Sequence, residues 1–163
     1  MERKPGKVER VSKEVFEITL KGVIPTTNGS ALFLHTEIKT FVIYVDAYFG
    51  NLISIHLKKV PRDRPLTHDL IRNIFFGLGV TLERVVIADV AEGTFFARII
   101  LKMHNELGLK LVEVDARPSD AILLALQDEK PILVSKKTLD LVDDMTEVFH
   151  RILAEHQTPP EEA

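Results

Sequence analysis

The apolar positions of the N-terminal third follow the two-residue period of a β-strand. Residues 15–20 place Phe16, Ile18 and Leu20 on one face, which predicts a strand with one buried side. Asn28-Gly29 is a strong turn signal. The apolar runs that follow this turn predict two further strands, over residues 31–36 and 41–45.

A second group of strands is predicted as an antiparallel meander in the second half of the chain. In residues 94–103 the odd-numbered side chains from Phe95 to Met103 are apolar, while Arg98 and Lys102 fall on the other face. Turn residues precede and follow this run. The pattern predicts strands over residues 84–90, 94–103 and 109–116, and a short strand over 131–135.

Helical periodicity separates the strands. We predict helices over residues 47–58, 67–78, 119–128 and 138–156, the first three capped by Asp46, Thr67 and Ser119. The last helix would carry an apolar stripe of Leu141, Met145, Val148 and Ile152. The elements together predict an α+β fold, a mostly antiparallel sheet with helices packed against it. We expect one domain over residues 1–157 and a flexible tail over 158–163.

Composition narrows the class of protein. The chain has 163 residues, 45% of them hydrophobic, which suits one compact domain. It holds no apolar run of about 20 residues, and its N-terminus is charged, so we expect a cytoplasmic protein without a membrane partner. Cysteine is absent, which excludes disulfides and thiolate sites. Neither GxxxxGK[ST] nor GxGxxG occurs, so we expect no nucleotide or redox cofactor.

Two stretches of similar composition stand before predicted helices. The first Arg-Pro segment, residues 64–71, reads RPLTHDLI, and the second, residues 113–126, reads EVDARPSDAILLAL. Proline, a hydroxyl residue and an aspartate are ordinary at the start of a helix, which accounts for Thr67 and Ser119. Helix-start chemistry does not require the charged residues that strand alternation would place on one face: Glu113, Asp115 and Arg117.

These charged residues are the types that phosphodiester hydrolysis needs. Carboxylates would hold a divalent cation such as Mg²⁺ or Mn²⁺, for which the candidates are Glu113, Asp115 and Asp120. An arginine would stabilise phosphoryl charge, and a base would activate water. The candidate catalytic residues are therefore Arg64, His68, Asp69, Asp115, Arg117 and Asp120. The site requires the two Arg-Pro segments to meet in space.

A basic stretch leads into the first Arg-Pro segment. The net charge of −3 argues mildly against a dedicated nonspecific nucleic-acid binder, because such proteins usually present a basic face. Residues 58–64, KKVPRDR, reverse this balance locally. They form either an ordinary solvated loop or a phosphate-binding surface. In the second case the substrate-binding residues would be Lys58, Lys59 and Arg62, together with Thr67 and Ser119.

The sequence resembles the bifunctional nuclease family. The resemblance rests on residues 64–71, on EGTFFARI (92–99) and on VDARPSDAILLAL (114–126), in this order and followed by PILV (131–134). It implies an α+β domain, DNase and RNase activity in at least some members, and a homodimer. The leading hypothesis is a metal-assisted nuclease of low sequence specificity. The alternative is a non-enzymatic dimeric module that binds an anionic small molecule or a protein partner, with Arg64 and Arg117 holding the anion.

Overall fold

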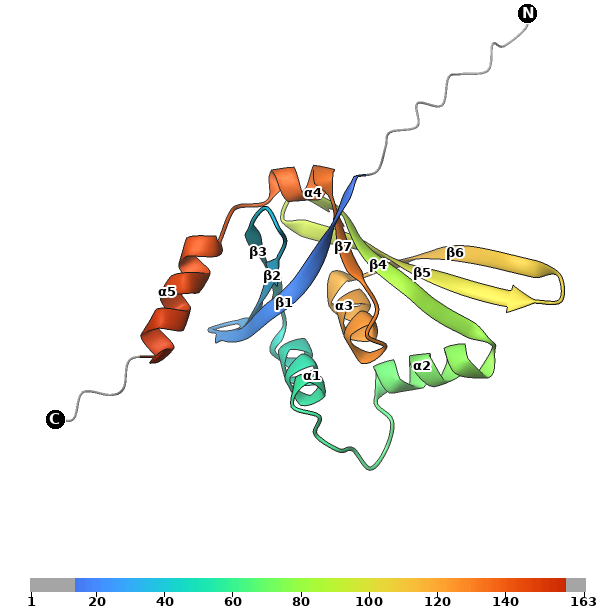
Figure 1. Ribbon diagram of the computed structural model, residues 1–163. Coiled ribbons are helices and arrows are strands. Elements are labelled where there is room, and N and C mark those ends of the chain that lie inside the picture. Colours follow the sequence, from blue (N-terminus) through green and yellow to red (C-terminus); the bar gives the residue numbers. More distant parts are fainter. Residues whose placement is uncertain (1–13, 158–163) are drawn as a thin grey trace, which may run out of the picture.

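The computed structural model describes residues 14–157, and the predicted tail 158–163 lies outside them (Figure 1). Strands and helices alternate irregularly along the chain, which is typical of an α+β domain. The elements are β1 (Val15–Thr26), β2 (Gly29–His35), β3 (Thr40–Val45), α1 (Ala47–Leu57), α2 (Thr67–Gly77), β4 (Val80–Ala91), β5 (Thr94–Asn105), β6 (Gly108–Ala116), α3 (Pro118–Gln127), β7 (Ile132–Ser135), α4 (Lys136–Leu141) and α5 (Thr146–Gln157).

Within residues 14–157, seven strands form one sheet in the order β3-β2-β1-β7-β4-β5-β6. Every neighbouring pair is antiparallel except β4 and β7, which run parallel. Each predicted strand is present, and β1 and β4 extend well beyond their predicted bounds. The predicted α+β class is therefore confirmed.

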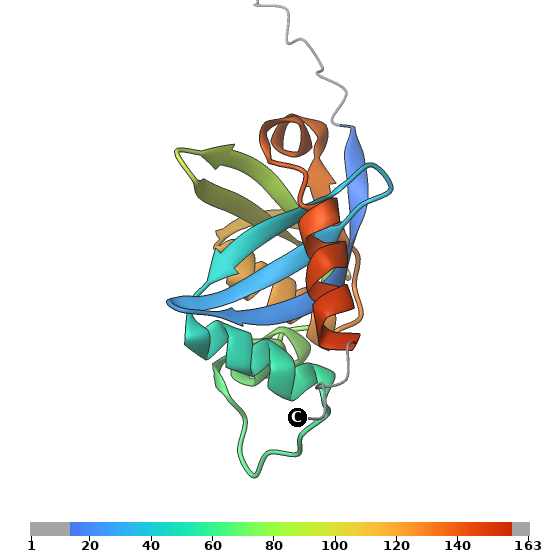
Figure 2. The same ribbon diagram turned by 90° about the vertical axis from the view of Figure 1, so that its left-hand side faces the viewer.

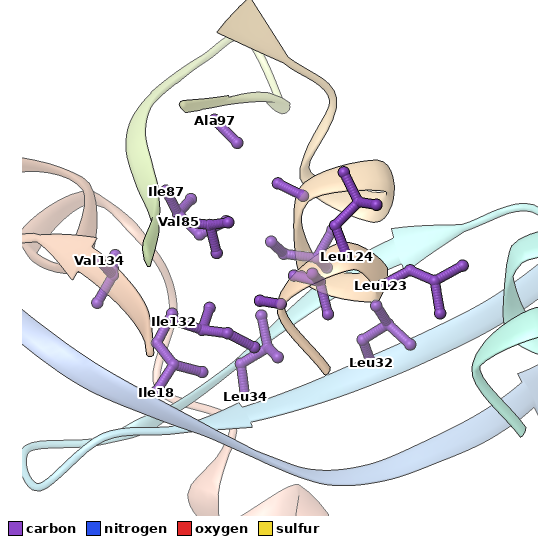
Figure 3. Packing of buried hydrophobic residues seen from close by; sticks show 14 of the residues in the cluster. Ile18, Leu32, Leu34, Val85, Ile87, Ala97, Leu123, Leu124, Ile132 and Val134 are labelled. Atoms are coloured by element: carbon purple, nitrogen blue, oxygen red, sulfur yellow. The ribbon is translucent and has the colours of Figure 1, made fainter. Parts of the chain in front are cut away.

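The helix α3 lies at the centre of the hydrophobic core. All five residues from Ala121 to Ala125 are buried, as expected for a helix that is apolar around its circumference. Figure 3 shows Leu123 and Leu124 among side chains from both halves of the sheet, such as Leu34 and Val85. Because the core fixes α3 on all sides, the residues at its N-terminus are held in a defined position.

The prediction of one long C-terminal helix is wrong. The chain leaves the helical conformation at Val142, and α4 and α5 are separate helices. Leu141 is exposed, whereas Phe149, which the predicted stripe omitted, is buried and stacks on Phe33 with a centroid distance of 4.9 Å. Met145 and Ile152 pack around this pair. The helix α5 thus covers the outer side of β1, β2 and β3 (Figure 2).

The helix starts differ from the predictions in two of three cases. Asp46 caps α1 as predicted, accepting a hydrogen bond from the backbone N–H of Phe49. Thr67 and Ser119 are not caps: Thr67 is the first residue of α2 and Ser119 the second residue of α3, and the N-cap residues are Leu66 and Arg117. Among residues 14–157, no helix is long and apolar enough to cross a membrane.

Candidate functional site

The two Arg-Pro segments meet through one hydrogen bond. The ring nitrogen Nε2 of His68, in the first turn of α2, lies 2.8 Å from Oδ1 of Asp120, in the first turn of α3. The two residues are 52 positions apart in sequence. The packing of α2 beside α3 therefore creates the contact that the sequence analysis required for a shared site.

Arg117 completes a polar cluster around the same carboxylate. Its Nε donates to Oδ2 of Asp120 at 2.8 Å, so Asp120 accepts one hydrogen bond at each oxygen. The guanidinium lies 4.9 Å from the centroid of the Phe49 ring, within cation–π range. Asp120, through this hydrogen bond and through its charge, raises the pKa of Arg117, and Asp46 contributes in the same direction. We call these residues the His68–Asp120–Arg117 cluster.

His68 is the buried member of the cluster, with 5% of its surface exposed. Its ring stands edge-on to Phe49 at a centroid distance of 5.6 Å. Its Nδ1 is buried and has no hydrogen-bond partner. If Nε2 carries the proton that bonds Asp120, Nδ1 is an acceptor facing apolar surroundings. A buried ring in this place is better suited to orienting Asp120 than to exchanging protons with bulk water.

Arg117 is the exposed member of the cluster and lies at the edge of a cavity of about 350 Å³. The cavity lies between the edge strand β3, the start of β5 and the N-terminus of α3. Its lining combines aromatic rings with a few polar groups: Ile43, Tyr44, Val45, Asp46, Phe49, Gly93, Thr94, Phe95, Arg117, Pro118 and Ser119. Asp46 and Thr94 are cavity residues that the sequence analysis did not select. The sequence marks Asp46 only as a helix cap, and a cap motif carries no signal of a nearby cavity.

Asp69, a predicted catalytic residue, makes hydrogen bonds that hold local structure together. One carboxylate oxygen accepts from the backbone N–H of Leu66 at 2.8 Å, which caps α2. The other accepts from Arg62 at 2.6 Å and from the amide of Gln127 at 3.2 Å. The Arg62 guanidinium and the Asp69 carboxylate are thus engaged in fastening the loop and α2 to α3.

Glu113 and Asp115 lie away from the cluster. Asp115 pairs across the ladder with Arg98, and Arg98 pairs with Val86, so these side chains share the side of β4, β5 and β6 opposite α3, which we call the open face. The Asp115 and Arg98 side chains approach to 3.6 Å, and Asp115 is largely exposed. Arg117 leaves this face, because the helix start at Pro118 redirects the chain. The predicted placement of Glu113, Asp115 and Arg117 on one face is therefore wrong.

The predicted metal ligands are consequently divided between two faces of the sheet. Glu113 and Asp115 lie on the open face, while both oxygens of Asp120 bond His68 and Arg117. Within residues 14–157, no group of three histidine, aspartate or glutamate side chains is close enough together to hold a metal ion.

The basic loop between α1 and α2 is exposed to solvent. Lys58, Lys59 and Arg64 are exposed, and within the described part of the chain none of them forms an ion pair. Ser119 is buried at the cavity, and Thr67 is exposed in the first turn of α2. The predicted substrate-binding residues are thus spread over a loop and two helix starts.

The fold and cluster define a single α+β domain whose polar site lies at a strand-to-helix junction beside a cavity. A model of the bifunctional nuclease domain matches residues 32–145, and the chain belongs to this family. "Uncharacterized protein MT1877" and "Uncharacterized protein Rv1829", from Mycobacterium tuberculosis strains CDC 1551 and H37Rv, are similar to this chain. Each is 40% identical over 87 residues, or 53% of this chain and 49% of the relative. The matched region thus spans about half the length of these curated relatives.

Proposed function

We propose that this protein is a nuclease that hydrolyses phosphodiester bonds of DNA or RNA with low sequence specificity. The observation that carries the proposal is the His68–Asp120–Arg117 cluster, which joins the two Arg-Pro segments at a cavity. Membership of the bifunctional nuclease domain family supports the same chemistry. We propose further that the protein acts in the cytoplasm and as a homodimer.

Arg117 would bind the phosphoryl group. Its Nε is engaged by Asp120, while its two terminal nitrogens make no hydrogen bond within residues 14–157. A guanidinium offers a pair of donors that matches two phosphate oxygens. The N-terminus of α3 adds free backbone N–H groups and the positive end of the helix dipole beside it. Negative charge that develops on the phosphoryl oxygens would therefore be stabilised at the edge of the cavity.

The other two members of the cluster would hold Arg117 in position. Asp120 fixes the guanidinium through Nε, and His68 fixes Asp120 from the buried side. A carboxylate with a bond at each oxygen cannot rotate freely, so the arginine points in one direction before substrate arrives. Such preorganisation lowers the cost of charge stabilisation in the transition state.

Metal assistance is part of the proposal, but the three predicted ligands do not form a joint site. Mg²⁺ is commonly bound through one or two carboxylates together with substrate phosphates. The exposed carboxylate of Asp46, at the cavity, is of the chemical type that such an ion prefers.

The test is cleavage of single- and double-stranded DNA and RNA by the purified protein, with Mg²⁺, Mn²⁺ or chelator. Arg117→Ala is expected to lower kcat/KM by about 10²–10³-fold, the usual effect of removing one donor that stabilises transition-state charge. Arg151→Ala, on the exposed side of α5, is the matched control and should retain parental activity. Equal activity of the two variants would exclude Arg117 from the reaction.

The pairing of the predicted carboxylates with arginines favours a second function. Asp69, Asp115 and Asp120 each pair with an arginine, so their charges orient guanidinium groups. This arrangement suits a non-enzymatic dimeric module that binds an anionic small molecule or a protein partner, with Arg64 and Arg117 as the anion-binding groups. Nucleic-acid or phosphate binding that depends on Arg117, without cleavage under any metal condition, would select this function over the nuclease.

A further inference from the structure

The cavity beside Arg117 is bounded on one side by the free edge of β3. Within residues 14–157, β3 pairs with β2 alone, so its other side is an edge of the sheet. In an antiparallel pair, the backbone groups of successive residues point alternately toward the neighbouring strand and away from it. The backbone of Thr40 points away from β2, since its carbonyl accepts from the N–H of Met145 at 2.7 Å and its N–H donates to the hydroxyl of Thr146 at 3.0 Å.

Tyr44 directs its backbone to the same edge. The register between β2 and β3 is unbroken, and Tyr44 follows Thr40 by four residues, so its N–H and C=O also point away from β2. Neither group has a hydrogen-bond partner in the part of the chain that the structure describes. The side chain of Tyr44 is 70% exposed and lies on the α5 side of β3, because Tyr44 pairs with Ala31. The edge that Tyr44 presents to the cavity is thus a backbone donor beside a backbone acceptor.

The other walls of the cavity carry a cation and an aromatic ring. The side chain of Arg117 is 67% exposed, and its Nε alone is engaged by Asp120. Phe95, at the start of β5, is half-buried and lines the same space. The cavity volume of about 350 Å³ lies in the lower part of the range of roughly 300–1,000 Å³ that small-molecule sites occupy. One cavity therefore combines a donor–acceptor pair, an aromatic surface and a group that binds anions.

We propose that this cavity holds the base of one unpaired nucleotide whose phosphate Arg117 binds, so that the protein selects single-stranded over double-stranded nucleic acid. The edge of a base presents donors and acceptors that complement the backbone of Tyr44, and its flat face packs on Phe95. In a duplex the complementary strand occupies this edge and adjacent bases cover both faces, so a paired base does not enter. The inference rests on the proposed function for the assignment of Arg117 to phosphate, and it adds the substrate class.

A nucleotide fits this edge better than a peptide does. An extended peptide adds to a sheet through a row of backbone hydrogen bonds. In β3 the start of α5 already engages Thr40, so the alternation leaves Val42 and Tyr44 for such a row, and of these two Tyr44 lines the cavity. A single donor–acceptor pair matches the edge of one base.

Substitution of Tyr44 tests the backbone contact. Tyr44→Pro removes the N–H, and proline is tolerated at an edge position whose N–H makes no ladder hydrogen bond. Tyr44→Ala is the matched control, because it removes the same ring and retains the N–H. The assay is fluorescence anisotropy of a short labelled single strand and of the blunt duplex of the same sequence, in the presence of chelator. Circular dichroism verifies that each variant is folded.

The parent protein should bind the single strand at least about tenfold more tightly than the duplex, because a paired base must first be unstacked and unpaired. Tyr44→Pro should weaken single-strand binding about threefold to tenfold, the effect of one lost hydrogen bond, and leave duplex binding unchanged. Tyr44→Ala should bind as the parent does. Arg117→Ala should weaken the binding of both nucleic acids, since each presents phosphates.

A second measurement uses the parent protein alone. Nucleoside monophosphates should displace the labelled strand at lower concentrations than inorganic phosphate does, because the base adds contacts in the cavity. Equal displacement, equal affinity for single strand and duplex, or equal single-strand affinity of Tyr44→Pro and Tyr44→Ala would overturn the inference. So would a parent that binds a short extended peptide through this edge and binds no nucleic acid. Because binding is measured without cleavage, a parent that shows the expected binding and cleaves no substrate would contradict the nuclease and support the inference.

Discussion

Substitution of His68 separates a positioning role from a role as general base. His68→Gln retains an amide that can donate to Asp120, but an amide cannot accept the proton of an attacking water. His68→Ala removes both the hydrogen bond and the ring. If His68 acts by holding Asp120, and through it Arg117, the glutamine variant should preserve most of the function that the alanine variant loses.

The stability cost follows from the surroundings of the ring. His68→Ala removes a hydrogen bond to a charged carboxylate, which contributes about 1.5–3 kcal/mol. It also removes roughly 60 Å³ of buried side chain, which costs about 1.5 kcal/mol at ~24 cal/mol per Å³ of cavity. The sum is about 4 kcal/mol, less than the free energy of unfolding of about 5–15 kcal/mol that folded domains possess, so we expect the variant to fold. For His68→Gln we expect about 1 kcal/mol, because the donor remains and most of the volume is filled.

The assays are urea denaturation and nuclease kinetics on the same preparations, below the unfolding temperature of the weakest variant. We expect His68→Ala to lower kcat/KM at least tenfold more than His68→Gln does, and the pH–rate profile of His68→Gln to keep the parental shape. His150→Gln, on the exposed side of α5, is the control for histidine replacement. A stably folded His68→Gln that is as inactive as His68→Ala, and has lost one limb of the profile, would refute the positioning role and establish His68 as the base.

Three further predictions address the folding of the domain and the open face. Hydrogen bonds from the hydroxyl and the backbone N–H of Thr146 lower the pKa of the Asp144 carboxyl. The contribution of Asp144 to stability is therefore present above the ordinary aspartate pKa of about 4 and is lost as the pH falls through the lowered value. Denaturation from pH 6 to pH 2 should show the advantage of the parent over Asp144→Asn disappearing at low pH. Gly50→Ala should destabilise the domain in thermal melts, because a Cβ there would overlap a serine side chain, whereas Gly77→Ala, in open space on a helix, should stabilise it by about 0.5–1 kcal/mol. The Glu113→Gln/Asp115→Asn double variant should retain parental nuclease activity, since both residues lie on the open face, and a loss comparable to that of Arg117→Ala would move the site to that face.

Local sequence predicted the elements that local chemistry determines. The alternation in β5, the cap at Asp46 and the turns needed no tertiary information, and all are present. The prediction of one continuous C-terminal helix failed because distant partners fix residues 142–145. The side chain of Lys39 donates to the carbonyl of Val142, and the N–H of Met145 donates to the carbonyl of Thr40 in β3. No proline or glycine marks this break, so periodicity alone runs through it.

The candidate site was predicted only in part, because tertiary packing also decides which of its residues meet. Sequence spacing identified both Arg-Pro segments, but their contact through His68 and Asp120 arises from the packing of α2 beside α3, which strand and helix periods do not encode. The face of Arg117 was assigned by extending strand alternation one residue too far. Proline at the first position of α3 makes Arg117 an N-cap, and its side chain then turns towards Phe49.

The division of charges between the two sides of the sheet has a functional consequence. Alternation along β6 sends Glu113 and Asp115 to the open face, whereas the turn into α3 sends Arg117 to the cavity, with Asp120 bonded to it. The acids of the strand therefore cannot neutralise Arg117, and Asp120, shared with His68, is the carboxylate that bonds it. Arg117 keeps its two terminal nitrogens for an external anion, while the hydrogen bond from its Nε to Asp120 fixes the direction of the guanidinium. The first Arg-Pro segment contributes to this fixation through His68, which bonds Asp120 from the start of α2.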